Sequence, residues 1–155
     1  GGSLPLAATL ATPRIFEAHY SEDRSRTFFH SSSYTANPVC CAAALANLTV
    51  WETEPVLERI ATLERLQEES LAALADDPRF VNPRRLGTIA AVDVKVPDGG
   101  YLAAAGPALR AHFLDRGVLL RPLGNTIYVM PPYCTTADDL HLVYDAIRSA
   151  PDKLA

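Results

Sequence analysis

The sequence predicts an α/β protein in which most of the chain forms a small α+β layer, a short sheet covered on one face by helices. Three observations carry this prediction. Apolar residues recur at the helical period between residues 56 and 74. In residues 89–96, an apolar set of side chains (Ala90, Val92, Val94 and Val96) alternates with a mixed set (Ile89, Ala91, Asp93 and Lys95), as in a half-buried strand. Gly117 and Thr136 then supply a helix stop and a helix start.

The first third of the chain has a mixed pattern. Residues 4–10 are apolar and contain a threonine, which predicts a short buried strand. Thr12 and Pro13 are typical of an N-cap and a first helical position, so a short helix is expected to run from there to Tyr20. The polar residues 21–26 that follow are expected to form a loop.

A second helix is predicted after Asn37 and Pro38. The asparagine oxygen can accept a first-turn N–H, and proline needs no donor at that position. The predicted helix covers residues 39–51 and is rich in alanine. Small side chains suit a helix that packs closely against another backbone element or a partner subunit.

The rest of the chain is predicted to alternate between helices and short strands. The expected elements are a helix from Pro55 to about residue 74, a strand over 89–96, a helix over 102–116, short strands over 118–120 and 126–129, and a helix over 136–149. Residues 122–125 form a plausible tight turn between the two short strands. The first fifty residues lack matching elements, so their apolar surface is expected to belong to a larger body.

Composition excludes several classes of function. The chain has 155 residues, 48% of them hydrophobic and 21% charged, with 14 Lys and Arg against 18 Asp and Glu. A net charge of -4 argues against extended electrostatic binding of nucleic acid. The sequence has no uninterrupted apolar run that would predict a membrane span. Three cysteines without paired spacing predict free thiols in a reducing compartment, the cytoplasm. The four histidines share no metal-ligand spacing, so no metal site is expected.

Two segments suggest a binding site. Three serines and a threonine before the helix at residue 38 could hold an anion with hydroxyls, N–H groups and the helix dipole, or could be an ordinary capping loop. Arg121 follows an apolar run that predicts a buried strand and precedes a proline; it suits bidentate capture of a carboxylate, or a surface ion pair. Tyr128 is as readily a core aromatic as a ligand contact.

A family resemblance adds to this interpretation. Three blocks, GGSLPLAATLAT, FFHSSSYTANPVCCAAALANLTVWE and GVLLRPLGNTIYVMPPY, resemble in order and spacing the C-terminal part of class III, fold-type I, pyridoxal-phosphate aminotransferases. The likeness covers essentially the whole chain. The first two blocks are typical of the whole class, whereas the third resembles the members that act in biotin biosynthesis.

The resemblance implies two domains. Residues 1–51 would be the end of the large cofactor-binding domain, including its phosphate loop, and residues 52–155 would be the small C-terminal α+β domain. The family lysine that holds the cofactor as a Schiff base would lie upstream of Gly1, and neither Lys95 nor Lys153 aligns with it. The chain has no initiator methionine and is expected to be a piece of a longer protein, inactive by itself.

The resemblance also implies site residues. Ser33 stands at the position of the usual phosphate-binding threonine, on a loop that reaches the cofactor of the other subunit in a homodimer. Ser32 and Ser31 stand where proline and glycine are common; Ser32 would lie at the cofactor and Ser31 at the substrate. Arg121 matches the arginine that holds the acceptor carboxylate, and Tyr128 matches an aromatic residue of the same pocket.

The implied reaction transfers the amino group of S-adenosylmethionine to 8-amino-7-oxononanoate through pyridoxal phosphate, giving 7,8-diaminononanoate. The partners would be these small molecules and a second subunit. Two alternatives stay open. The protein could be another class III enzyme that acts on an ω-amino acid or a diamine, or the chain could be a non-catalytic binding or dimerisation module.

Overall fold

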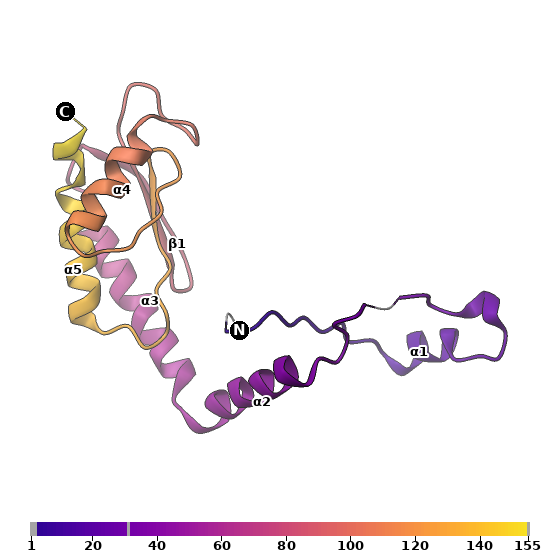
Figure 1. Cartoon of the computed structure of the whole chain (residues 1–155). Helices are drawn as coiled ribbons and strands as arrows, with labels where there is room; N and C mark the ends of the chain where they lie inside the picture. Colours follow the sequence, from indigo (N-terminus) through magenta and orange to yellow (C-terminus); the bar gives the residue numbers. More distant parts are fainter. Residues whose placement is uncertain (1–2, 31, 155) are drawn as a thin grey trace. The chain divides into compact units, whose positions relative to one another are not determined.

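A computed structural model describes residues 3–30 and 32–154, and its contacts divide the chain into two units (Figure 1). Unit 1 comprises residues 1–54 and unit 2 comprises residues 55–155. The division falls at the turn between two helices, three residues after the boundary expected from the sequence. The proposed identity of each part stays a prediction.

Unit 2 is an α+β layer, as the sequence predicts. Its elements are α3 (Val56–Ala72), β1 (Phe80–Leu86), β2 (Ile89–Val94), α4 (Ala105–Asp115), β3 (Thr126–Val129), α5 (Ala137–Arg148) and the short 3-10 helix η2 (Ala150–Lys153). Figure 1 shows the helices of this unit gathered on one side of its sheet. Helix α5 begins with the expected cap: the Thr136 hydroxyl accepts from the Asp139 N–H, and the Asp139 carboxylate accepts from the Thr136 N–H.

The sheet is antiparallel with the order β1-β2-β3. Strand β1 was not predicted, because Asn82 and Pro83 interrupt its pattern. The structure accommodates them in a bulge between Val81 and Arg84, where Asn82 takes a positive φ of 53°. The expected strand 118–120 is wrong: none of these residues joins the sheet, so its third strand is β3 alone.

The core of unit 2 lies between the sheet and its helices. The predicted alternation in β2 is confirmed, because Ala90, Val92 and Val94 are buried. Helices α3, α4 and α5 contribute the opposite side of the core, in which the largest fully buried apolar side chains are Phe113, Leu63, Leu109, Leu140 and Ile147. Unit 2 therefore holds an apolar core of its own, which provides most of its stability.

A polar pair lies inside this core. The Tyr144 hydroxyl of α5 donates a hydrogen bond to Gln67 Oε1 of α3, and both side chains are buried. Gln67 Nε2 in turn donates to the carbonyl oxygens of Thr88 and Val129, at 3.0 and 3.5 Å. Burial raises the pKa of Tyr144 above its usual range, so the hydroxyl stays protonated and can donate.

Replacing Tyr144 with phenylalanine is expected to lower the free energy of unfolding by about 1 to 3 kcal/mol, because it leaves Gln67 Oε1 buried without a donor. Denaturant unfolding of the chain measures this effect. The control is Tyr101→Phe, which removes a hydroxyl from an exposed residue and should change stability by no more than about 0.5 kcal/mol. Equal effects of the two substitutions would contradict the prediction.

Unit 1 contains α1 (Pro13–His19), the short 3-10 helix η1 (Arg24–Arg26) and α2 (Pro38–Thr53). Both helices that the sequence predicts are confirmed. Asn37 caps α2 as expected, because its side-chain oxygen accepts from the N–H groups of Val39 and Cys40, at 3.0 and 3.3 Å. The expected loop over residues 21–26 is partly wrong, since its last residues form η1.

The predicted strand over residues 4–10 is wrong. A strand needs a hydrogen-bonded partner, and within the described part of unit 1 no other segment pairs with this one. Leu4 and Leu6 instead line a groove with Ala43 and Ala44 of α2. Two of the small side chains of α2 therefore face another backbone segment, whereas Ala42 and Ala46 are exposed.

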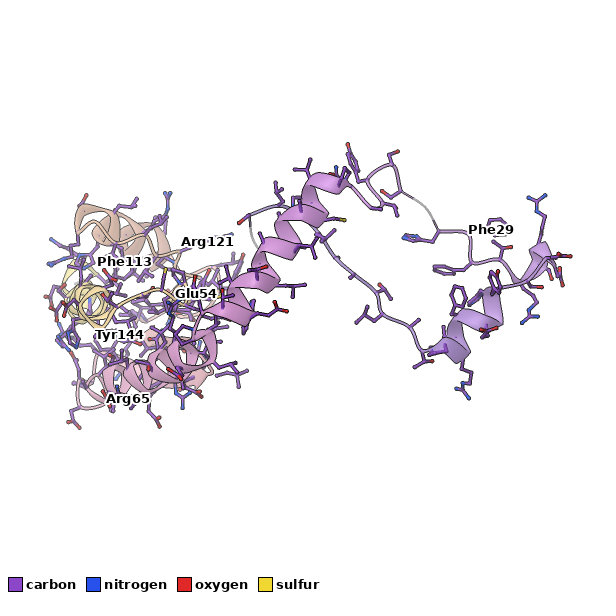
Figure 2. The ribbon with its side chains drawn as sticks, turned by 90° about the horizontal axis from the view of Figure 1, so that it is seen from below. Phe29, Glu54, Arg65, Phe113, Arg121 and Tyr144 are labelled. Atoms are coloured by element: carbon purple, nitrogen blue, oxygen red, sulfur yellow. The ribbon has the colours of Figure 1, made fainter. Side chains whose placement is uncertain are left out.

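Unit 1 has large apolar side chains at its surface. None of its described residues is buried, and Phe29 is 76% exposed (Figure 2). In the described part of the chain, no helix combines the length and the apolar character that a bilayer crossing requires. These side chains match the expectation that unit 1 covers its apolar surface against a larger body.

Candidate functional site

A cleft of about 850 Å³ opens on unit 2 beside Arg121. Three segments line it: the loop 101–104, the face of α4 that carries Arg110, and residues 121–124. The walls are apolar apart from the guanidinium groups of Arg110 and Arg121, and none of the described residues that line the cleft is acidic. The cleft is therefore positively charged and suits an anionic ligand with an apolar body.

Arg121 is exposed at this cleft. The sequence left open a surface ion pair for this residue, but the ion pairs described in unit 2 involve other arginines, among them Arg65, Arg79, Arg84, Arg85 and Arg148. No described residue contacts the Arg121 guanidinium through a hydrogen bond or a salt bridge. Its donors are therefore available to a carboxylate, which a guanidinium can bind with two parallel hydrogen bonds.

The backbone that carries Arg121 differs from the prediction. Arg121 was expected at the tip of a buried strand, but residues 118–120 form an irregular segment in which Leu119 is 81% exposed. Apolar composition misled the prediction. Val118 is buried and Leu120 packs against the core, but Leu119 faces outward and none of the three residues pairs with a strand of the sheet.

A tight turn directly after Arg121 holds its backbone in place. Pro122 restricts φ, and Leu123 and Thr126 then exchange two backbone hydrogen bonds of 2.9 and 3.0 Å. The expected turn over residues 122–125 is therefore confirmed. Gly124 lies within the turn with a φ of 60°, a conformation that a side chain would disfavour.

Tyr128 lies on a different surface from the cleft. It is half-buried in the middle of β3, opposite Ala91 of β2, between the core residues Ile127 and Val129. Because side chains alternate along a strand, Tyr128 points to the face of the sheet opposite the core. The described residues that line the Arg121 cleft do not include Tyr128, so the structure of unit 2 does not bring these two predicted site residues together.

The face that Tyr128 shares is polar. Asp93 of β2 accepts hydrogen bonds there from Thr126, at 2.8 Å, and from Arg84, at 3.0 Å. Partial burial opposes ionisation of Asp93, but the hydrogen bonds from Arg84, Thr126 and Asn82 outweigh it and hold the pKa of that carboxyl below its usual range. This carboxylate is therefore neutralised by neighbours within unit 2.

The serine loop of unit 1 lies just before α2. Ser31 is outside the described residues. The Ser32 hydroxyl accepts from the Tyr34 N–H at 3.3 Å, and Ser33 opens a turn that ends at Ala36. Both Ser32 and Ser33 are exposed, so their hydroxyls can reach a ligand.

The anion cradle expected at this loop is only partly present. Asn37 already occupies the N–H groups of Val39 and Cys40, which removes two backbone donors of the α2 N-terminus. The hydroxyls of Ser32 and Ser33 remain available as donors, and the exposed Thr35 hydroxyl, which accepts from the Ser32 N–H, can donate as well. A phosphate group fits this donor set, because exposed hydroxyls beside a helix N-terminus can hydrogen-bond its oxygens. Ser32 and Ser33 are thus the described residues that could hold the phosphate of a cofactor.

Residues that the sequence analysis did not single out also shape the cleft. Arg110 and Tyr101 line it, and Asn125 fixes the turn after Arg121. No sequence motif pointed to Arg110, because exposed arginines are common on helices. The Gly-Asn pair predicted the turn, but the partners of Asn125 lie 25 and 31 residues away and could not be inferred from local pattern.

The chain is similar to known aminotransferases. A family model described as aminotransferase class-III matches residues 1–150. The adenosylmethionine-8-amino-7-oxononanoate aminotransferase of Synechococcus elongatus is 42% identical over 157 residues, which cover 99% of this chain and 36% of that protein. The protein of the same name from Geobacter sulfurreducens is 36% identical, over 96% of this chain and 34% of that protein. The chain thus spans about a third of the length of the curated relatives it matches.

Solved structures agree with this similarity. The crystal structure of adenosylmethionine-8-amino-7-oxononanoate aminotransferase from Methanocaldococcus jannaschii has a TM-score of 0.88 and 31% identity, and covers 98% of this chain and 36% of that one. An amine transaminase from an uncultivated Pseudomonas species, in its PLP-bound form, has a TM-score of 0.83 and 30% identity, and covers 96% of this chain and 35% of that one.

Proposed function

The chain belongs to the class III aminotransferases, and on this premise we propose that it is the C-terminal third of an enzyme of biotin biosynthesis. The intact enzyme would transfer the amino group of S-adenosylmethionine to 8-amino-7-oxononanoate, giving 7,8-diaminononanoate. The names of the relatives at 33 to 42% identity support this choice of substrates. Unit 1 would be the end of the large cofactor-binding domain, and unit 2 the small C-terminal domain.

The observation that carries this proposal is the unpaired guanidinium of Arg121 in a positively charged cleft with apolar walls. The acceptor 8-amino-7-oxononanoate has a carboxylate at the end of an aliphatic chain. Arg121 would bind that carboxylate, and the apolar walls would accept the chain. Binding at this distant end orients the reacting ketone and so lowers the entropic barrier to reaction.

The serine loop would serve the cofactor. Pyridoxal phosphate, when bound, supplies the electron sink that amino-group transfer requires. Ser33 would donate a hydrogen bond to its phosphate, and Ser32 would lie beside it, while Ser31 would lie at the substrate. Tyr128 lies away from the cleft in unit 2. Its proposed contact with the substrate would therefore require that the rest of the enzyme form a substrate-binding surface together with this face of the sheet.

The exposed apolar side chains of unit 1 support a homodimer in which the serine loop reaches the cofactor of the other subunit. An unpaired apolar surface of this kind is typical of an interface. We place the enzyme in the cytoplasm, where its three free cysteines would stay reduced.

The test of this function is turnover by the intact protein that carries this chain. We expect S-adenosylmethionine to serve as amino donor to 8-amino-7-oxononanoate, with 7,8-diaminononanoate detected by mass spectrometry. Turnover of an ω-amino acid or a diamine in place of the ketone acid would assign another class III activity, which the similarity to an amine transaminase makes the second candidate. If no pair of amino donor and acceptor reacts, the remaining interpretation is a non-catalytic binding or dimerisation module.

Replacing Ser33 with alanine in the intact protein is expected to weaken cofactor binding by about 0.5 to 1.5 kcal/mol, the contribution of one hydrogen bond. Cofactor retention after dialysis, measured by its absorbance, tests this. Ser25→Ala is the matched control, since Ser25 is also an exposed serine of unit 1 but lies in η1. The role of Ser33 is excluded if both variants retain the cofactor equally.

A further inference from the structure

Asn125 joins the walls of the Arg121 cleft. It lies in the turn after Arg121, and it is only 8% exposed although its side chain is polar. Its side-chain Oδ1 accepts from the Gly100 N–H at 2.6 Å, and its Nδ2 donates to the Val94 carbonyl oxygen at 2.8 Å. Because a buried amide must satisfy its donors and acceptors within the protein, these contacts hold the side chain in one orientation.

The two partners of Asn125 have different positions in the fold. Val94 ends β2 and belongs to the rigid sheet, and its N–H also donates to the Asn125 carbonyl oxygen at 2.9 Å. Gly100 immediately precedes Tyr101, the first residue of the loop that lines the cleft. Asn125 therefore connects the sheet, the loop and the turn that follows Arg121.

Glycines allow these segments to approach one another. A Cβ atom at Gly124 would overlap the carbonyl oxygen of Gly100, so the turn and the loop are in direct backbone contact. A Cβ at Gly99 would lie 3.3 Å from Asn125 Nδ2, and one at Gly106 of α4 would lie 3.4 Å from the Gly124 carbonyl oxygen. All three walls of the cleft thus meet at the Gly124-Asn125 pair.

We propose that Asn125 is a positioning residue that sets the place of the Arg121 guanidinium relative to the opposite wall of the cleft. The buried amide holds the loop at Tyr101 against the turn, which directly follows Arg121; Asn125 itself is three residues further along the chain than Pro122. This proposal rests on the proposed function in one respect, that Arg121 binds the carboxylate of the acceptor. The connection between loop and turn stands independently of any reaction.

Hydrogen exchange of the unsubstituted chain tests the connection. The Gly100 amide should exchange about 100-fold or more slowly than an unprotected amide, as a buried hydrogen bond implies. Asn125→Ala should remove that protection while the amides of α3 and α5 keep theirs. Thr126→Val is the matched control: it deletes the neighbouring hydrogen bond to Asp93 and should leave Gly100 protected. An unprotected Gly100 in the unsubstituted chain would overturn the proposal, even if Asn125→Ala failed to fold.

Kinetics of the intact enzyme test the positioning. Asn125→Ala should raise the KM for the acceptor about tenfold, because a displaced Arg121 guanidinium would lose one of its two hydrogen bonds to the acceptor carboxylate. The kcat and the retention of cofactor should each change by less than about twofold, and Thr126→Val should change none of the three. If the rise in KM were accompanied by a comparable fall in kcat and in the amount of bound cofactor, the role of Asn125 would be merely structural and the proposal would be overturned. If the unsubstituted enzyme did not convert the acceptor, the proposed function would be refuted instead. The hydrogen-exchange experiment would still test whether Asn125 connects the loop at Gly100 to the turn.

Discussion

Replacing Arg121 with alanine in the intact enzyme is expected to weaken binding of the acceptor by about 2 to 5 kcal/mol, because the acceptor carboxylate would then be enclosed without its partner. The guanidinium is unpaired within the described part of the chain, so no internal ion pair has to break before it binds. Steady-state kinetics with 8-amino-7-oxononanoate measure the effect as a rise in KM. Cofactor retention should stay near that of the unsubstituted enzyme.

The control for this prediction is Arg116→Ala. Arg116 is an exposed arginine of the same unit, at the C-terminal cap of α4, and it does not line the cleft. Removing it changes the net charge by the same amount, so any general electrostatic effect on an anionic substrate appears in both variants. If Arg121→Ala weakened cofactor and acceptor equally, its role would be structural rather than one of substrate binding.

Replacing Phe113 with alanine is expected to lower the free energy of unfolding of unit 2 by about 3 to 5 kcal/mol. Phe113 lies on α4, is fully buried, and belongs to the apolar core between the helices and the sheet of unit 2 (Figure 2). Truncation removes an entire ring from that core and leaves a cavity that the packed neighbours can fill only in part. Denaturant unfolding followed by circular dichroism measures the loss.

The neighbouring residue supplies a matched control. Leu114 is also a large apolar residue of α4, but it is 45% exposed. Leu114→Ala should cost no more than about 1 kcal/mol, since little apolar area returns to water. Similar costs at the two positions would show that α4 does not pack in the orientation described here.

Sequence patterns were reliable where a local rule decides the structure. The cap at Asn37, the hydroxyl cap at Thr136 and the alternation in β2 each depend on neighbouring residues, and the structure confirms all three. The patterns failed where pairing decides it. Residues 4–10 and 118–120 have the composition of strands but no described partner to pair with, whereas β1 contains Pro83 and still pairs by means of a bulge.

The candidate site shows the same division. The residue order around Arg121 resembled a family in which an arginine binds a carboxylate, and the family membership is confirmed by the match over residues 1–150. The roles of Ser31, Ser32, Ser33, Arg121 and Tyr128 stay predictions. Sequence could not show that Tyr128 and Arg121 lie on different surfaces of unit 2, because that depends on which face of β3 enters the core.

By itself, the sequence determined the family, the presence of the helices, the caps at Asn37 and Thr136, the central strand and the presence of a guanidinium before a proline turn, because each is encoded in residues that are close together in the chain. Only the tertiary structure decided that three segments converge at Asn125, that the Arg121 cleft is positively charged, and that unit 1 has no buried core among its described residues. The side-chain contacts of Asn125 join residues that are 25 and 31 positions apart, and they form only when the chain has folded.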